Sequence, residues 1–162
     1  MKFLESKLKR VYEEVRNGHR VMSPFGMTIE KIGIEIRFDK FELIEIYLQK
    51  VNEEINEYKS IREIIGSAES ILKNDITSRR AVFYIGRKFN GQEMECLSMI
   101  QFLVRENLLY VFVYVRSLDI QRKLPSDVIA VAHAVAPLAV RLNLEVSSLY
   151  FYIASAHVYI SG

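Results

Sequence analysis

Leu109-Tyr110-Val111-Phe112-Val113-Tyr114-Val115 is the stretch of this sequence that most clearly indicates its fold. Every residue in it is apolar or aromatic, and many are β-branched, a composition typical of a strand in the core of a sheet. Residues 81–85 and 97–104 are similarly apolar, although the second run also fits a helix. We therefore expect a group of core strands between residues 81 and 115.

Helical patterns surround these strands. Residues 2–16 place Leu4, Leu8, Val11 and Val15 on one helical face. Residues 41–72 are rich in Glu, Ile and Lys and predict two helices joined near Lys59. A further helix is expected over residues 128–142, after polar residues that resemble a helix start.

The remaining strand signals lie near the two ends of the chain. Asn17-Gly18 predicts a turn, and Ile32, Ile34 and Ile36 alternate as in a half-buried strand, so a hairpin or a pair of strands is expected there. Residues 149–160 predict a last strand. The order α, β, α, β, α, β indicates an α+β fold, a mixed β-sheet packed against helices, in a single domain over residues 1–162.

Composition narrows the classes of function. The chain has 162 residues, 50% of them hydrophobic and 26% charged, as expected for a globular protein. Its net charge of +2 is too small to indicate a nucleic-acid binder. The single cysteine excludes an internal disulfide, and the N-terminal residues lack the apolar core of a signal peptide, so we expect a cytoplasmic protein.

No membrane segment and no metal site are expected. The longest apolar run, residues 128–139, contains His133 and Pro137 and is shorter than the roughly 20 residues that span a bilayer. Because the net charge is only +2, recognition of an anion must come from a local group of basic side chains.

Two groups of residues suggest chemistry, although each also has an ordinary explanation. Cys96 opens an apolar segment, where a lone cysteine is more often a buried thiol than a nucleophile. Arg116, Ser117 and Asp119 follow the strand of residues 109–115, at a strand end where ligands often bind, but a solvated turn has the same composition.

Two further pairs are compatible with nucleotide binding. Arg79-Arg80 directly precedes a strand, and two guanidinium groups can share the oxygens of one phosphate, although surface arginines look the same. His157 and Tyr159 alternate on the last strand, so they share a face and could bind a ribose or a base. Either could equally be a half-buried polar residue with its hydrogen bonds satisfied.

In order and spacing these pieces resemble the thymidylate synthase family, which includes hydroxymethylases that act on cytidine nucleotides. Cys96-Leu97-Ser98-Met99-Ile100-Gln101-Phe102 looks like the family's nucleophile motif, and Arg116-Ser117-Leu118-Asp119 looks like its Arg-Ser-x-Asp. Leu124-Pro125-Ser126-Asp127 resembles Leu-Pro-x-Asn/Asp, and Ala156-His157-Val158-Tyr159 resembles His-x-Tyr. The residues from Asn74 to Arg80 resemble the double-arginine loop.

The resemblance implies a thymidylate-synthase-like fold and a pyrimidine nucleoside 5′-monophosphate as substrate. It implies that the Cys96 thiolate adds to C6 of the base, so that C5 can accept a one-carbon unit from 5,10-methylenetetrahydrofolate. A nearby guanidinium favours the thiolate, so Arg116 could assist Cys96. The implied roles of the other residues are phosphate binding for Arg116 and Ser117, substrate binding for Gln101, sugar binding for His157 and Tyr159, base recognition for Asp127 and pterin binding for Asp119.

The family's phosphate site is shared between two subunits, which implies a homodimer in which Arg79 and Arg80 of the partner subunit reach the phosphate. One further phosphate ligand looks lost, because Phe25 stands where the family would have an arginine. Arg20 is a possible substitute, although a solvated loop arginine explains it equally simply.

Other departures affect the chemistry. Glu95 replaces the proline that commonly precedes the nucleophile, and the family's acid–base glutamate has only approximate matches in Glu63 and, as a rival, Glu42. The chain is shorter than the family between Asp39 and Leu72 and after His-x-Tyr, and it has no tryptophan, so we expect a reduced folate site.

Asp127 favours a cytosine nucleotide. Members that use uracil have an asparagine there, whereas a carboxylate suits the amino group of cytosine better, unless Asp127 merely caps a helix. Two functions therefore remain open. One is an enzyme that transfers a one-carbon unit to C5, with hydroxymethylation favoured over methylation, and the other is a nucleotide-binding protein that has lost folate chemistry.

Overall fold

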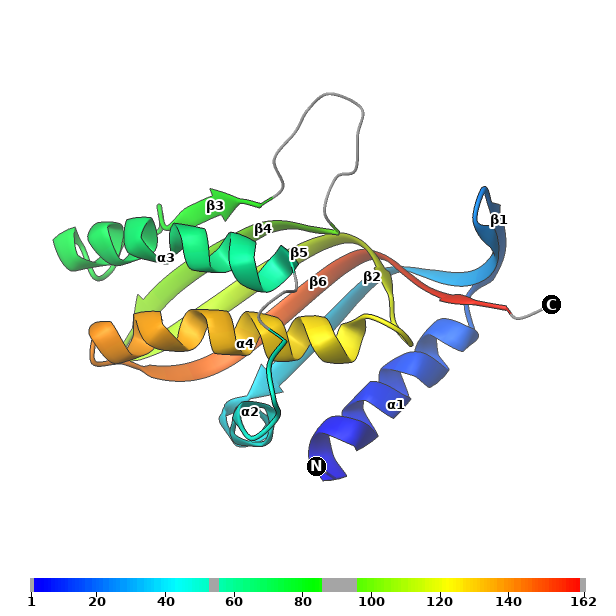
Figure 1. The fold of residues 1–162 in the computed structure, drawn as a ribbon, viewed down its shortest axis with the longest axis horizontal. Helices are drawn as coiled ribbons and strands as arrows, with labels where there is room; N and C mark the ends of the chain where they lie inside the picture. Colours follow the sequence, from blue (N-terminus) through cyan, green and yellow to red (C-terminus); the bar gives the residue numbers. More distant parts are fainter. Residues whose placement is uncertain (1, 53–55, 86–95, 161–162) are drawn as a thin grey trace.

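A mixed six-stranded sheet organises the chain in the computed structural model, which describes residues 2–52, 56–85 and 96–160. The strands lie in the order β1-β2-β6-β5-β4-β3 (Figure 1). Strands β5 and β6 are parallel, and the other neighbouring pairs are antiparallel. The strand bounds are β1 His19–Ser23, β2 Gly26–Asp39, β3 Val82–Tyr84, β4 Leu97–Arg105, β5 Leu108–Asp119 and β6 Glu145–Tyr159.

Helices connect and cover these strands. Their bounds are α1 Lys2–Arg16, α2 Lys40–Tyr47, α3 Asn56–Asn74 and α4 Leu124–Arg141. Helix α4 lies across the sheet beside α3, and α1 packs against β2 and β6 (Figure 1). The structure confirms the expected α+β class, the hairpin after residue 18, and helix and strand types along the chain.

One expectation is wrong, and two alternatives that the sequence left open are excluded. Lys59 lies inside α3, because the break between the two helices comes earlier, after Tyr47. Residues 97–104 are strand and not helix, because β4 pairs with β3 on one side and with β5 on the other. Asp127 does not cap α4, since that helix begins at Leu124 with Lys123 as its N-cap.

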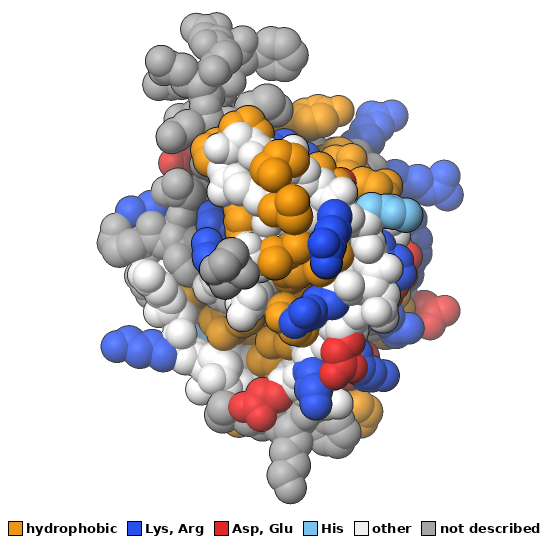
Figure 2. Space-filling model, turned by 90° about the vertical axis from the view of Figure 1, so that its right-hand side faces the viewer, with side chains coloured by type: hydrophobic (Ala, Val, Ile, Leu, Met, Phe, Trp, Pro, Cys, Tyr) orange, Lys and Arg blue, Asp and Glu red, His pale blue; other side chains and the backbone are white. Residues whose placement is uncertain are grey.

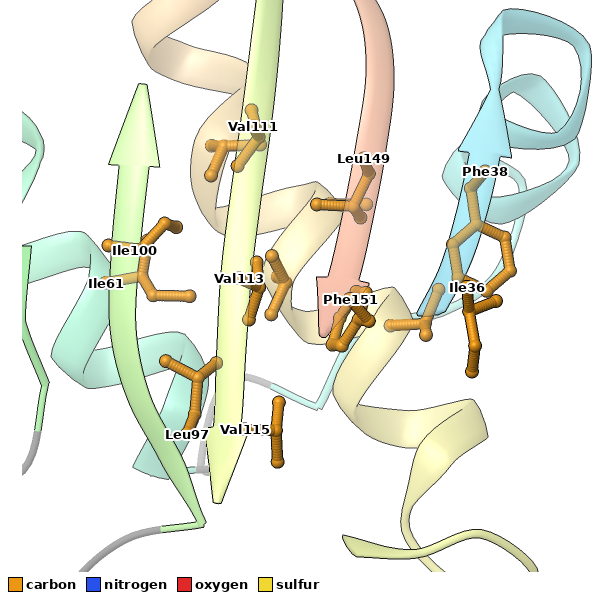
Figure 3. Close-up of a cluster of buried hydrophobic side chains, with 14 of the residues drawn as sticks. Ile36, Phe38, Ile61, Leu97, Ile100, Val111, Val113, Val115, Leu149 and Phe151 are labelled. Atoms are coloured by element: carbon orange, nitrogen blue, oxygen red, sulfur yellow. The ribbon is translucent and has the colours of Figure 1, made fainter. Parts of the chain in front are cut away.

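The hydrophobic core fills the space between sheet and helices. Phe38, Phe102 and Phe151 from three strands are fully buried, and Ile61 and Ile65 reach the same cluster from α3. Figure 3 shows part of this cluster, with side chains of β2, β4, β5 and β6 beside helices. Burial on this scale supplies the main favourable free energy of folding.

Helix α4 belongs to this core. By length and mean hydropathy (1.3) it would pass as a membrane span, but 56% of it is buried inside the protein. It contacts β5, β6, α2 and α3, as the central helix of a layered domain does.

The sheet has an irregularity at one level of three adjacent strands. The register is the same on both sides of this level, with Ile34↔Ile153 and Ile32↔Ser155 between β2 and β6 and Val115↔Ile153 and Ser117↔Ser155 between β5 and β6. The pairing skips Gly33, Ala154 and Arg116.

Burial changes phase at the same level. On β6 the buried residues are Leu149, Phe151 and Ile153 before it, and Ala156 and Val158 after it. The skip of one residue on each strand keeps the apolar side chains on the core without a change of register. It also turns the alternate residues, Ser155, His157 and Tyr159, away from the core.

Strand β5 shows the same change in burial, and the pairing of Glu30 with His157 and of Lys31 with Ala156 extends it to β2. On β5 the buried residues pass from Val113 and Val115 to Leu118. On β2 the break coincides with Gly33, whose φ of 71° suits glycine, and beyond it Lys31 points to α1, where its Nζ lies 2.6 Å from Glu14 Oε1. The three strands together therefore present polar side chains beyond the core.

Candidate functional site

A cavity of about 490 Å³ lies where these three strands present their polar residues. Six of the residues singled out in the sequence line it. They come from β5, β6 and the position directly before β4: Cys96, Arg116, Ser117, Asp119, His157 and Tyr159. The β1–β2 hairpin contributes Val21, Ser23 and Phe25 to its wall. The fold therefore joins residues up to 138 positions apart (159 − 21), from Val21 to Tyr159, in one site.

The rim by the hairpin is both apolar and basic. Met22, Phe25 and Ile32 are 70%, 83% and 67% exposed. Figure 2 looks onto the end of the molecule that carries β1 and shows Lys and Arg side chains beside a strip of hydrophobic ones. Such a border suits a ligand that has both a charged group and a ring.

The thiol and the first arginine are held next to each other. Cys96 is half-buried at the entrance of β4, and its carbonyl oxygen accepts a hydrogen bond from the backbone N–H of Arg116, with N and O 2.9 Å apart. Because this bond belongs to the β4–β5 pairing, the rigid sheet fixes the two residues side by side.

The histidine lies in the middle of the polar group. His157 on β6 is aligned with Asp119 on β5, and its Nδ1 lies 3.5 Å from Ser117 Oγ. The rings of His157 and Tyr159 are 5.5 Å apart, edge to face. Arg122, which sequence reasoning missed, lies over Tyr159 with its guanidinium carbon 5.1 Å from the ring centre.

Asp119 is partly occupied by its own turn. Its Oδ1 accepts the backbone N–H groups of Gln121 at 3.1 Å and Arg122 at 3.0 Å, while Oδ2 lies 3.7 Å from Arg122 Nε. The second oxygen is thus beyond hydrogen-bond distance of that guanidinium and can accept from a ligand N–H. The carboxylate fits the pterin-binding role, although Arg122 and Lys123 make this side of the cavity cationic.

Glu30 is another cavity residue that sequence reasoning missed. It lies on β2 directly opposite His157, and the hydroxyl of Ser155 donates a short hydrogen bond to its Oε1. The available signal was the alternation of Thr28, Glu30 and Ile32 before Gly33, which places these residues on one face of a strand.

The double-arginine loop borders a different cavity, of about 760 Å³. Arg79 and Arg80 are exposed there, beside Arg105, whose Nη1 donates to the carbonyl of Thr77. Gln101 Nε2 donates to the carbonyl of Arg79 at 3.1 Å, so within this chain Gln101 supports the loop.

Hydrogen bonds shape the same loop from inside. Thr77 donates from its hydroxyl and its backbone N–H to Asp75 Oδ1. These bonds, with Arg105 and Arg80 nearby, lower the pKa of Asp75 below its usual range.

Four other predicted residues do not line the cavity of Cys96 in this chain. Arg20 is exposed on β1 between Val21, which does line the cavity, and His19. Glu63 is exposed on α3. Asp127 is buried in the first turn of α4, one turn after the cavity residue Lys123.

Glu42, the rival to Glu63, has a structural role. With Asp39 it forms the capping box of α2, its Oε2 accepting the backbone N–H of Asp39 at 2.9 Å and the Nζ of Lys7 at 2.6 Å. Glu95 lies outside the described residues. Within the described ranges no three His, Cys, Asp or Glu side chains are grouped as a metal site.

A thiol, basic side chains, hydroxyls and a histidine line one cavity, so the site offers a nucleophile beside groups that can bind an anion. A family model described as thymidylate synthase matches residues 16–161. The chain therefore belongs to the thymidylate synthase family, as the motifs predicted.

A solved structure supports the fold. The crystal structure of thymidylate synthase from T4 phage superposes with a TM-score of 0.72 at 18% identity, covering 95% of this chain and 76% of that one. A search of curated proteins finds no match. Family membership implies a methyltransferase and suggests one-carbon transfer to C5 of a pyrimidine nucleotide, normally with methylenetetrahydrofolate, in proteins that typically form dimers.

Proposed function

We propose that this protein transfers a one-carbon unit to C5 of a pyrimidine nucleoside 5′-monophosphate, with hydroxymethylation of a cytosine nucleotide favoured and methylation next. The observation that carries the proposal is that Cys96 and Arg116 line one cavity as hydrogen-bonded neighbours. The backbone N–H of Arg116 donates to the carbonyl oxygen of Cys96, with N and O 2.9 Å apart. Binding of an anion alone would not need a thiol at that place.

The cavity can orient such a nucleotide by charge. Arg116, Arg122 and Lys123 are the cations in its wall, so the phosphate is attracted to the ends of β5 and the start of α4. Ser117 adds a hydroxyl donor, while His157 and Tyr159 offer groups for the sugar. With the phosphate and sugar held on β5 and β6, the base extends toward Cys96 at the start of β4.

The chemistry then follows from the thiol. The Cys96 thiolate forms a bond to C6, and the electron pair of the C5–C6 double bond becomes available at C5. C5 would bond to the one-carbon unit as the first bond between that carbon and a nitrogen of its carrier breaks, and C5 would lose its proton to solvent. In hydroxymethylation water would supply the oxygen as the second carbon–nitrogen bond breaks and the carrier leaves. The sulfur–C6 bond would then break and restore the double bond. A neighbouring guanidinium favours the thiolate over the thiol, which is the role we assign to Arg116.

5,10-Methylenetetrahydrofolate, when bound, supplies the carbon unit. Asp119 Oδ2 is the acceptor that this chain offers to a pterin N–H. A reduced thiol is required throughout, in agreement with the cytoplasmic location expected from the sequence.

Asp127 supports the preference for cytosine through its chemistry. A carboxylate accepts from the amino group at C4, which uracil lacks. Asp127 lies one helical turn beyond Lys123, so it would act on the base from the first turn of α4.

A homodimer with a shared phosphate site forms part of the proposal. The rings of Phe112, Tyr150 and Tyr152 stack on the sheet, and Tyr114 and Tyr152 remain 41% and 37% exposed, as on a face that another subunit covers. Arg79 and Arg80 border another cavity of their own chain, which is compatible with delivery to a partner.

Mixed subunits test the shared site. Arg79→Ala and Arg116→Ala proteins should each bind the nucleotide weakly, whereas their mixture regains some full-strength sites. A mixture that binds no better than either variant would show that both arginines act within one chain.

Tritium release tests the chemistry. The protein is incubated with C5-tritiated CMP, dCMP, UMP or dUMP, with and without the folate, and Cys96→Ser serves as the size-matched control. We expect folate-dependent release, strongest with a cytosine nucleotide, and none from the serine variant. Absence of release from all four at saturating nucleotide would refute the enzymatic proposal.

The second candidate is a protein that binds the nucleotide without turnover. Phe25 in the cavity wall in place of an arginine, and the positions of Glu63 and Glu42 away from the cavity, favour it. Nucleotide binding that is unchanged in Cys96→Ser, together with no tritium release, would support this function instead.

A further inference from the structure

Glu30 occupies a defined place in the cavity that neither the motifs nor the proposed chemistry uses. It forms a row with His157 and Asp119, because β2 and β5 flank β6 and the three residues are aligned in register. Neighbouring strands lie about 4.8 Å apart. Measured across the sheet between backbone positions, Glu30 is therefore one strand spacing from His157 and two spacings, about 10 Å, from Asp119. A sugar ring fits over such a row.

The carboxylate of Glu30 is half-buried and oriented. The Ser155 hydroxyl donates to Oε1, and in the described part of the chain Glu30 forms no ion pair with a lysine or arginine. Its Oε2 is therefore able to accept a hydrogen bond from a ligand. The site is also rigid, since the carbonyl of Glu30 abuts Gly18.

Charge decides which part of a nucleotide this carboxylate faces. A phosphate is repelled by Glu30 and attracted to Arg116, Arg122 and Lys123 at the other strands. A carboxylate can accept a hydrogen bond from a neutral hydroxyl group. In dinucleotide-binding sites an acidic residue binds the ribose 2′-hydroxyl in this way.

We infer that Glu30 reads the sugar and selects a ribonucleoside 5′-monophosphate over its 2′-deoxy counterpart. This rests on the proposed function, in which His157 and Tyr159 bind the sugar. Where His157 holds one hydroxyl, the hydroxyl on the neighbouring carbon lies toward β2, and Glu30 Oε2 accepts its hydrogen. Ser155 acts as a positioning residue through its bond to Oε1.

Calorimetric titration of four nucleotides tests the inference. CMP, dCMP, UMP and dUMP are titrated into the wild-type protein, Glu30→Gln and Glu13→Gln. Glu13 is the matched control, because it is an exposed glutamate of α1 that lines neither the cavity nor the aromatic face of the sheet. We expect the wild type and Glu13→Gln to bind each ribonucleotide roughly tenfold or more tightly than its deoxy form, as a hydrogen bond to a charged group allows.

Glu30→Gln should bring that ratio to about threefold or less, because a neutral amide accepts a weaker bond. Ser155→Ala retains the carboxylate of Glu30 and should lower the ratio of ribonucleotide to deoxyribonucleotide affinity only in part. It replaces Glu30→Gln as the test if that variant does not fold. A wild-type ratio near one, or an equal ratio in wild type and Glu30→Gln, overturns the inference while the proposed function stands. Failure of all four nucleotides to bind would instead overturn the proposed function.

Discussion

An alanine at position 18 would collide with the backbone of β2 at Glu30. The added Cβ would lie 2.1 Å from the carbonyl oxygen of Glu30, 2.7 Å from its carbonyl carbon and 2.9 Å from the carbonyl oxygen of Val15. No side-chain rotation relieves contacts with backbone atoms, so the turn after α1 and strand β2 must separate. Overpacking of this kind costs about 3 kcal/mol, which for a protein of 162 residues corresponds to a fall in Tm of roughly 6–12 °C.

Differential scanning calorimetry of Gly18→Ala measures this effect, and Gly66→Ala is the matched control. Gly66 lies inside α3, and a methyl group added to it would meet no atom within 4 Å, so its replacement should stabilise the protein by about 0.5–1 kcal/mol. If Gly18→Ala melts within about 1 °C of the wild type, the close approach of the turn to β2 does not hold the cavity wall as described.

Three further variants probe the cavity, the core and the arginine loop. Phe25→Arg should tighten nucleotide binding by roughly tenfold at low salt and less at high salt, because it adds a cation to the cavity wall; equal affinity at both salt concentrations would contradict this. Burial raises the pKa of Tyr47 to about 12, and its hydroxyl has no hydrogen-bond partner among the described residues. The folded state thus keeps a proton that the unfolded state loses near pH 10, so stability falls between about pH 10 and about pH 12. In urea unfolding, Tyr47→Phe should gain about 1 kcal/mol at pH 8 and more at pH 11, and a loss at both would count against it. Thr77 lowers the pKa of Asp75, whose contribution to stability is present above about pH 4 and is lost as the pH falls below it. Melting curves of Asp75→Asn should therefore show a smaller drop on acidification than those of the wild type, and an identical drop would refute the role of this carboxylate.

Element types could be predicted from the sequence because each depends on a local period. Residues 2–16 have an unbroken apolar face and form α1 as expected, and residues 109–115 form the centre of β5. The break between α2 and α3 was misplaced at Lys59, since lysine and glutamate are common in helices and give no stop signal. The cap at Asp39, which starts α2 directly after β2, depends on side-chain contacts that a period does not contain.

The candidate site was predictable only where motifs carried it. Cys96, Arg116, Ser117, Asp119 and His157 were found by their order along the chain and share the cavity. Arg79 and Arg80 were named for the same ligand, as residues of a partner subunit, and within their own chain they border another cavity. Gln101, named as a substrate ligand, donates instead to the carbonyl of Arg79.

Glu30 escaped prediction for a different reason. Its position in the site depends on the phase change near Gly33, and such a change is defined by pairing with the neighbouring strand. A glutamate in an alternating strand otherwise looks like a solvent-exposed residue, as Glu35 is.

The irregularities of β2, β6 and β5 lie at one level, so the lengths of these strands are coupled. A single residue inserted into β6 beyond Ile153 would turn His157 and Tyr159 inward and Ala156 and Val158 outward, unless both neighbours changed with it. Lineages of this fold should therefore gain and lose residues between the strands, as in the shortened region between Asp39 and Leu72, while the spacing from Arg116 to Asp119 and from Ser155 to Tyr159 is inherited as a block.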